Sequence, residues 1–124
     1  FLLSRAAPAR LVRLSPQGEP LPGQIYLLQR REVILGSDAQ RAAIVFDDPS
    51  LQGVHARLLH EGNTFKISDA GSVAGTWVNF HQVLPGGQAL QHGDLLHLGR
   101  VALRFELTHA KNLPQPRVLP YTEG

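Results

Sequence analysis

The chain has 124 residues, 43% of them hydrophobic, and a formal net charge of +2 at pH 7. A chain of this size forms one domain whose core needs no cross-links. It contains no cysteine, which excludes a disulfide scaffold, a thiolate zinc site and a cysteine nucleophile. No apolar run reaches the ~18 residues that a transmembrane helix requires.

The positive charge comes from the two ends of the chain. Between Leu11 and Leu107 there are eight basic and nine acidic residues. A protein that follows a nucleic-acid backbone usually clusters Lys and Arg on its folded part. We therefore expect no nucleic-acid partner; binding through the basic tails is an alternative hypothesis.

In chain order, residues 1–8 are expected to be a tail or the remnant of a juxtamembrane segment, and Ala9–Leu14 to form the first strand. Ser15–Gly23, with three prolines, is expected to be a turn-rich segment. Further strands are predicted at Gln24–Leu28, Glu32–Leu35, Ala42–Phe46, Val54–His60, Thr64–Ser68, Thr76–Asn79, Gln82–Leu84, Gln88–Leu90, Leu95–Leu98 and Val101–Leu107. Residues 108–124 are expected to be a flexible, proline-containing tail.

Two of these runs show the alternation of a half-buried strand. Phe65 and Ile67 point to one face of Thr64–Ser68, and four apolar residues alternate with polar or small ones in Val101–Leu107. Glu61-Gly62-Asn63 connects a hairpin. Short strands with turn signals every 8–12 residues or so predict an all-β fold, a β-sandwich.

The stretch Asp69–Asn79 places two glycines and several small residues between two predicted strands. Gly71 and Gly75 adopt positive φ at little cost, which predicts a tight turn. Asp69 is expected to accept hydrogen bonds from backbone N–H groups of this turn. Trp77, the only tryptophan of the chain, is expected to pack against the sheet.

Five elements, in order along the chain, resemble those of forkhead-associated (FHA) domains. They are Leu35-Gly36; Asp48-Pro49-Ser50 with His55 and Ala56; Asp69-Ala70-Gly71-Ser72 with Gly75-Thr76; Val78-Asn79; and Gly93-Asp94 with Leu98-Gly99. The resemblance covers residues 9–107 and implies an FHA/SMAD-like sandwich of about eleven strands with its binding loops at one end. It also implies a structural framework of Gly36, His55, Asp69, Gly71, Ser72, Gly75, Thr76 and Asn79.

The same resemblance shows departures at the contact positions. In FHA domains an arginine and a serine hold the phosphate of a phosphothreonine peptide, and an asparagine holds the peptide backbone. The residues of this chain at those positions are Ser37, Gln52 and Ala74. A polar residue before that asparagine is replaced by Val73, and basic residues before the histidine by Gly53 and Val54.

These replacements remove charge-assisted hydrogen bonds worth roughly 1.5–3 kcal/mol each, about 3–6 kcal/mol or 10²–10⁴ in affinity together. We therefore predict a non-catalytic protein–protein interaction module in which phosphothreonine recognition is weakened or lost. The expected binding loops comprise Ser37, Arg41, Leu51, Gln52, Gly53, Val73 and Ala74. The alternative is an altered phosphothreonine reader that uses Ser37, Arg41 and Gln52 together with backbone N–H groups.

A hydrolase that uses Ser50, His55 and Asp69 is a further alternative, which requires their side chains to converge within ~3 Å. We expect no catalytic group, because the resemblance implies a structural role for His55. The six histidines fall at irregular intervals, so no metal and no cofactor are expected. The expected partner is a protein, including a threonine-containing peptide, with no membrane contact by the domain itself. The expected location is the cytoplasm, as the soluble part of a larger or membrane-anchored protein.

Overall fold

The computed structural model describes residues 7–108, which form eleven strands in two sheets. The strands are β1 Ala9–Leu14, β2 Pro20–Leu28, β3 Glu32–Gly36, β4 Ile44–Val45, β5 Ala56–Glu61, β6 Thr64–Asp69, β7 Thr76–Val78, β8 His81–Gln82, β9 Gln88–Leu90, β10 Leu95–Leu98 and β11 Val101–Leu107. The predicted all-β sandwich is confirmed. Most of the two expected tails lies outside the described residues. Within residues 7–108, no helix has the length and apolar character needed to cross a membrane.

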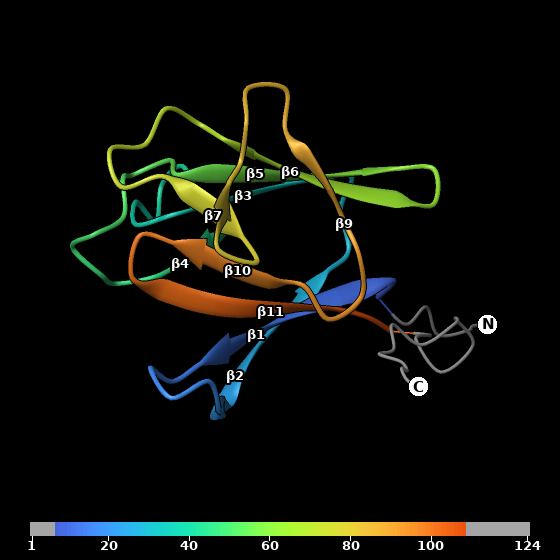
Figure 1. Cartoon of the computed structure of the whole chain (residues 1–124), viewed down its shortest axis with the longest axis horizontal. Coiled ribbons are helices and arrows are strands. Elements are labelled where there is room, and N and C mark those ends of the chain that lie inside the picture. Colours follow the sequence, from blue (N-terminus) through green and yellow to red (C-terminus); the bar gives the residue numbers. More distant parts are fainter. Residues whose placement is uncertain (1–6, 109–124) are drawn as a thin grey trace, which may run out of the picture.

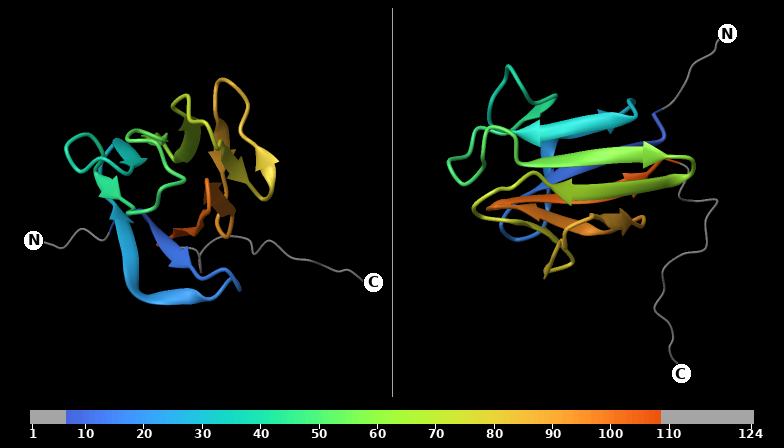
Figure 2. Two further views of the ribbon diagram at one scale, coloured as in Figure 1. Left: turned by 90° about the vertical axis from the view of Figure 1, so that its left-hand side faces the viewer. Right: turned by 90° about the horizontal axis from the view of Figure 1, so that it is seen from above.

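The two sheets face each other across the core (Figures 1 and 2). One has six strands in the order β2-β1-β11-β10-β7-β8, and the other has five in the order β4-β3-β5-β6-β9. Neighbouring strands run antiparallel, except that β3 and β4 are parallel. The chain crosses between the sheets several times, so that segments far apart in sequence meet in one sheet. The first strand, β1, pairs along its full length with the last strand, β11.

Alternating apolar residues of both sheets fill the core. Phe65 and Ile67 of β6 are buried, whereas Lys66 and Ser68 are not, as the sequence predicts. Phe105 of β11 is fully buried and lies 5.3 Å from Phe65, between ring centroids. This contact joins the two sheets directly, because the two aromatic rings come from different sheets.

Strands β2 to β8 have bounds that differ from the prediction, and the differences at β2 and β8 have identifiable reasons. Strand β2 begins at Pro20, four residues before the predicted start. Proline lacks an N–H group, but β2 is an edge strand with one partner, where that group is not needed. Strand β8 begins at His81, because Asn79 and Phe80 form a two-residue turn in which both residues have positive φ.

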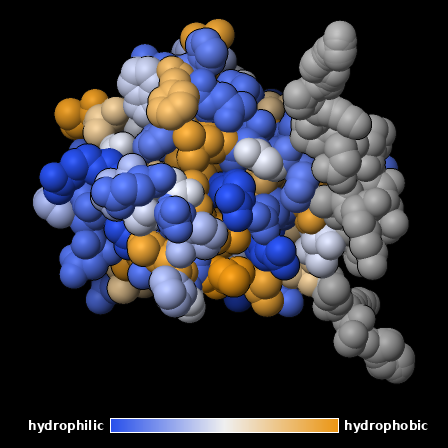
Figure 3. Space-filling view, turned by 60° about the horizontal axis from the view of Figure 1, so that its bottom comes forward, coloured by the Kyte–Doolittle hydropathy of each residue, from blue (hydrophilic) through white to orange (hydrophobic). Residues whose placement is uncertain are grey.

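Several hydrophobic side chains remain exposed. Ile25 and Leu27 of β2 are each more than half exposed, and the other large exposed side chains include Val73, Phe80 and Leu84. Figure 3 turns the side of the molecule that carries β1 and β2 toward the viewer and shows hydrophobic atoms interrupted by hydrophilic ones. The loops β3–β4, β4–β5 and β6–β7 and the turn β10–β11 gather at one end of the sandwich, on the left in Figure 1. We call this end the loop end.

Candidate binding site at the loop end

Asp69 ends β6 and organises the β6–β7 turn. Its Oδ2 accepts hydrogen bonds from the backbone N–H groups of Gly71 (2.9 Å) and Ser72 (2.8 Å). Its Oδ1 accepts from the hydroxyls of Ser72 and Thr76, both at 2.6 Å. Burial acts to raise the pKa of Asp69, but the hydrogen bonds from Ser72 and Thr76 outweigh it and hold the pKa below its ordinary value. A charged carboxylate therefore fixes the backbone of this turn.

The fully buried ring of His55 joins two loops. Its Nδ1 accepts a hydrogen bond from the backbone N–H of Gln52 at 3.2 Å, and its Nε2 donates to the carbonyl oxygen of Gly75 at 2.9 Å. These partners define the neutral tautomer that is protonated on Nε2. Both ring nitrogens are used to hold the β4–β5 loop against the β6–β7 turn.

The end of β3 lies against the β4–β5 loop. The backbone N–H groups of Ser37 and Asp38 donate to the carbonyl groups of Gln52 (3.0 Å) and Gly53 (3.3 Å). Gly36 leaves no room for a side chain, since a Cβ there would collide with the carbonyl of Gly53. This close approach places Ser37 directly beside Gln52, so the structure brings these two predicted contact positions together.

The side chains at the contact positions offer few groups to an anion. The hydroxyl of Ser37 donates to the carbonyl of Leu51 at 3.3 Å and is therefore directed into the loop. The side chain of Gln52 is exposed and makes no hydrogen bond within residues 7–108. Leu51 was expected among the binding residues, but the structure places its side chain in the core with 7% exposure. Only the backbone of Leu51 faces the loop.

Arg41 brings positive charge to this part of the site. Its Nε donates to Oδ2 of Asp38 at 2.8 Å, and its guanidinium lies over Gly53, where a Cβ would collide with it. The backbone N–H of Gln40 and then the side chain of Arg41 lower the pKa of Asp38. The Asp38 carboxylate is therefore charged at neutral pH and compensates the guanidinium charge.

The apex of the β6–β7 turn is apolar. Val73 is 90% exposed, and the neighbouring Ala74 is exposed as well. The indole N–H of Trp77 donates to the carbonyl of Ala74 at 3.2 Å, which holds the backbone of the apex. Gly75 follows with φ of +88°, and a Cβ at this position would lie 3.0 Å from the indole nitrogen. The turn thus has a fixed backbone and presents side chains without donors or acceptors.

The proposed hydrolytic residues each have other partners. The hydroxyl of Ser50 accepts from the backbone N–H of Arg100 at 2.9 Å, while His55 and Asp69 make the loop contacts described above. No hydrogen bond links any two of the three within the described residues. The described part of the chain also holds no group of three or more His, Asp or Glu side chains placed to bind a metal ion. These residues shape loops and do not assemble a catalytic site.

The nucleic-acid alternative relies on basic residues that mostly lie outside residues 7–108. Arg10 is the exception, since it belongs to β1 and its Nε lies 2.9 Å from Oε1 of Glu106. Its charge is therefore compensated within the sheet.

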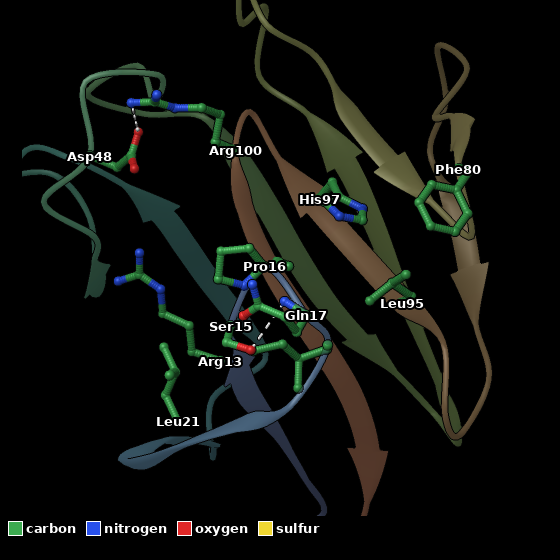
Figure 4. Close-up of a pocket in the computed structure, with 13 residues that line it drawn as sticks. Arg13, Ser15, Pro16, Gln17, Leu21, Asp48, Phe80, Leu95, His97 and Arg100 are labelled. Atoms are coloured by element: carbon green, nitrogen blue, oxygen red, sulfur yellow. Dashed lines mark hydrogen bonds and ion pairs between the residues drawn. The ribbon is translucent and has the colours of Figure 1, made fainter.

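Sequence reasoning missed a group of residues that line a cavity over the outer face of the six-stranded sheet and its loop-end edge. Arg13, His97 and Arg100 line this cavity with Phe80 of the β7–β8 turn (Figure 4). Arg13 belongs to the inward-facing row of β1, opposite buried Leu103, and reaches the cavity from the end of that strand. The alternation of Leu95 and His97 with buried Leu96 and Leu98 marks the first two as outward-facing. Alternation alone could not place them near β1, because it does not give the order of strands in the sheet.

Two packed sheets with loops held together at one end define a β-sandwich. The sequence model of the FHA domain family matches residues 33–99, which are more than half of the chain. The chain therefore belongs to the FHA domain family. FHA domains are non-enzymatic protein interaction modules that bind phosphopeptides.

Similar proteins were found both by sequence and among solved structures. The probable E3 ubiquitin-protein ligase dma1 of Schizosaccharomyces pombe is 32% identical over 80 residues, which cover 60% of this chain and 29% of that protein. The chain therefore spans less than a third of that relative. The FHA domain of the CT664 protein from Chlamydia trachomatis is 26% identical with a TM-score of 0.69, over 79% of this chain and 95% of that one. Mycobacterium tuberculosis EmbR, solved in complex with a low affinity phosphopeptide, has a TM-score of 0.72 at 23% identity, over 82% of this chain and 24% of that one.

Proposed function

We propose that this FHA domain binds a protein partner through its loop end with weakened or lost dependence on phosphothreonine. The observation that carries the proposal is the charge balance beside Ser37 and Gln52. Neither of these residues is cationic, and Arg41 is already paired with Asp38 at 2.8 Å. Among the described residues, the positions beside Ser37 and Gln52 therefore lack the uncompensated positive charge that phosphate recognition requires.

The energetic consequence follows from the charge of the ligand. A phosphothreonine carries about −1.5 to −2 charges at pH 7. To contact Arg41 it must compete with the Asp38 carboxylate and tolerate like-charge repulsion from it. Together with the roughly 3–6 kcal/mol assigned to the missing contacts, this leaves little selectivity for the phosphorylated form.

The apex of the β6–β7 turn supports contact with a protein. Val73 is almost fully exposed on a backbone that Asp69 and Trp77 hold in place. A preorganised apolar apex loses little conformational entropy when a partner covers it. Burial of Val73 and Ala74 would contribute hydrophobic free energy without any phosphate.

A restoration experiment tests this proposal. The variant Ser37→Arg/Gln52→Ser/Ala74→Asn restores the family's contact residues, and each form of the protein is titrated with matched phosphorylated and unphosphorylated threonine peptides. We expect a phosphorylation preference below tenfold for the natural chain and a gain of about 10²-fold or more in the variant. The double replacement Arg30→Ala/Arg31→Ala, in the exposed β2–β3 turn at the opposite end of β3 from the loop end, serves as the control and is expected to change neither value. A natural chain that already prefers phosphopeptides a hundredfold would overturn the proposal.

One observation favours the second candidate, an altered phosphothreonine reader. The guanidinium of Arg41 lies over Gly53 beside Gln52, so a cation is present at the loop end although it is not at the family's position. In this case Arg41→Ala abolishes phosphopeptide binding, and Asp38→Ala strengthens it by removing the competing carboxylate. Under the main proposal neither substitution changes the ratio of the two affinities.

A further inference from the structure

A cavity of about 720 Å³ lies on the outer face of the six-stranded sheet, beginning at the loop end (Figure 4). One wall is the β1–β2 turn with Pro16 and Gln17, and the opposite wall is Phe80. Strand pairing places His97 beside Ala102 and Ala102 beside Leu14, so these three residues cross the floor of the cavity. The volume is within the range of ligand-binding sites, roughly 300–1,000 Å³.

A second cavity of about 360 Å³ is lined by Trp77, Phe80, His97 and Gly99. Because it shares Phe80 and His97 with the first cavity, the two adjoin and form one trough along the sheet. We call it the outer trough. Phe80 lines both cavities, so its ring is accessible from each of them.

The conformation of Phe80 is unusual. It has φ of 69° after Asn79 with φ of 50°, and its side chain is 71% exposed. Two-residue turns of this kind favour Asn-Gly, since glycine avoids the steric penalty of positive φ. A bulky residue held in this region is strained, and such strain is concentrated at functional positions. The backbone of Phe80 is therefore strained, and in this conformation the Phe80 ring lies 5.3 Å from the His97 ring, between centroids.

The charged groups that line the outer trough have a positive balance. They are Arg13, Arg100 and Asp48. Arg13 has no carboxylate partner among residues 7–108, and its guanidinium carbon lies 5.6 Å from the centroid of the Phe46 ring. The Arg100 side chain is 71% exposed, with its Nη2 at 3.5 Å from Oδ1 of Asp48. An ion pair of this length and exposure contributes little, so Arg100 can turn toward a ligand. On the floor, Nδ1 of His97 is buried without a hydrogen-bond partner in the described part of the chain.

We propose that the outer trough docks an acidic peptide segment of a partner protein, with a large apolar side chain next to one or two carboxylates. The apolar side chain packs on Phe80 over His97, and the carboxylates pair with Arg13 and Arg100. A second copy of this chain is disfavoured as the occupant, because face-to-face pairing of two troughs brings like-charged arginines together. The outer trough does not include Ser37 or Gln52, but it shares Asp48 and Arg100 with the loop end, so one partner can contact both surfaces.

The test uses the whole chain and labelled peptides of about ten residues in fluorescence anisotropy titrations. Three sets of peptides are compared. The first set combines Leu and Phe with Asp and Glu, and the second combines Leu and Phe with Lys. The third set combines Ser with Asp and Glu. We expect the acidic apolar set to bind at least tenfold more tightly than the other two. Phe80→Gly is expected to weaken this binding tenfold or more, and Arg13→Ala or Arg100→Ala about threefold to tenfold.

Two matched controls replace exposed residues outside the outer trough. Leu84→Gly removes an apolar side chain with 73% exposure, and Arg57→Ala removes an exposed arginine; both are expected to leave peptide binding unchanged. In amide NMR spectra of the wild-type chain, addition of the peptide is expected to shift the resonances of His97 and of the Trp77 indole N–H. The resonance of Ser37 is expected to stay unchanged. Equal binding of the three sets, full binding to Phe80→Gly, or a dimer in the absence of peptide that Phe80→Gly dissociates would each overturn the proposal.

Discussion

The framework residues of the β6–β7 turn and the contact positions around it lie a few residues apart, but they differ in hydrogen bonding and in exposure. Asp69 accepts four hydrogen bonds, and His55 uses both ring nitrogens in contacts between loops. In contrast, Val73 and Gln52 are exposed side chains with no hydrogen bond to any residue of the described range. The framework determines the shape of the loop end, whereas the contact positions determine what it binds.

This difference explains how the fold persists although the expected ligand chemistry changes. Replacing His55 or Asp69 leaves buried or part-buried donors and acceptors without partners, which costs about 1–3 kcal/mol for each group. Replacing an exposed contact residue usually changes stability by less than about 0.5 kcal/mol. The contact positions are therefore able to change without loss of the sandwich.

The largest expected effect on stability comes from replacing a framework residue. Asp69→Ala removes the acceptor for Gly71, Ser72 and Thr76, and we expect it to lower the free energy of unfolding by about 2–4 kcal/mol. Asp47→Ala, at an exposed position outside the network, is the matched control with a change below about 0.5 kcal/mol. Both values come from urea denaturation, and a similar loss in the two variants would remove the distinction between the two regions.

Two glycines of the same turn separate backbone strain from steric contact. Gly71 and Gly75 both have φ of +88°, but a Cβ at Gly71 meets nothing within 4 Å, whereas one at Gly75 lies 3.0 Å from the Trp77 indole nitrogen. We expect Gly71→Ala to lower stability by about 1 kcal/mol and Gly75→Ala by about 2–3 kcal/mol. Thermal unfolding of both variants measures the difference, and equal values would show that Trp77 does not restrict the turn.

In the strained β7–β8 turn, substitution by glycine is expected to raise the stability of the chain, whereas the substitutions above lower it. Phe80→Gly relieves the positive φ and should raise the free energy of unfolding by about 1 kcal/mol. Phe80→Ala removes the ring but keeps the strain, so it should give no such gain. Urea denaturation distinguishes the two, and a loss of stability in Phe80→Gly would mean that the ring contact with His97 outweighs the strain.

Acid titration is expected to give a smaller signal from the same framework. The pKa of Asp69 in the folded chain lies below its ordinary value of 3.8, so its contribution to stability is fully present above that value and is lost as the pH falls through the folded pKa. Glu106 acts in the same sense, since hydrogen bonds from Arg10 and Arg104 outweigh the burial that raises its pKa. We expect Asp69→Asn to flatten the decline of stability below about pH 4, and Asp47→Asn to leave it unchanged. An unchanged decline in Asp69→Asn would contradict the assignment.

The smallest effect on stability is expected at the contact positions. Val73→Ser should change the free energy of unfolding by less than about 0.5 kcal/mol, because the side chain is 90% exposed. The same substitution should weaken binding of a loop-end partner, as measured by titration. A large loss of stability would place Val73 with the framework instead.

The sequence was sufficient for much of the fold. The alternation in β6 and β11 predicted buried Phe65, Ile67 and Phe105, and strands β1, β9, β10 and β11 have the predicted bounds. Strand β2 was predicted too short, because proline usually signals the end of a strand and only the order of strands reveals an edge. Local patterns determine strands, whereas neighbours within a sheet depend on the whole topology.

The same limit applies to the candidate site. The spacing of glycine and small residues identified the β6–β7 turn, but burial of Leu51 and the pairing of Arg41 with Asp38 depend on how the loops pack. The outer trough was not visible in the sequence, because Arg13 and His97 are 84 positions apart and meet only through β11 between their strands.

The most direct test of the central claim is a titration of the natural chain with a library of matched threonine and phosphothreonine peptides. We expect the two members of each pair to bind with affinities within a factor of about ten, or neither to bind. A preference of a hundredfold or more for phosphothreonine, lost in Arg41→Ala, would contradict the claim and establish the altered reader in its place.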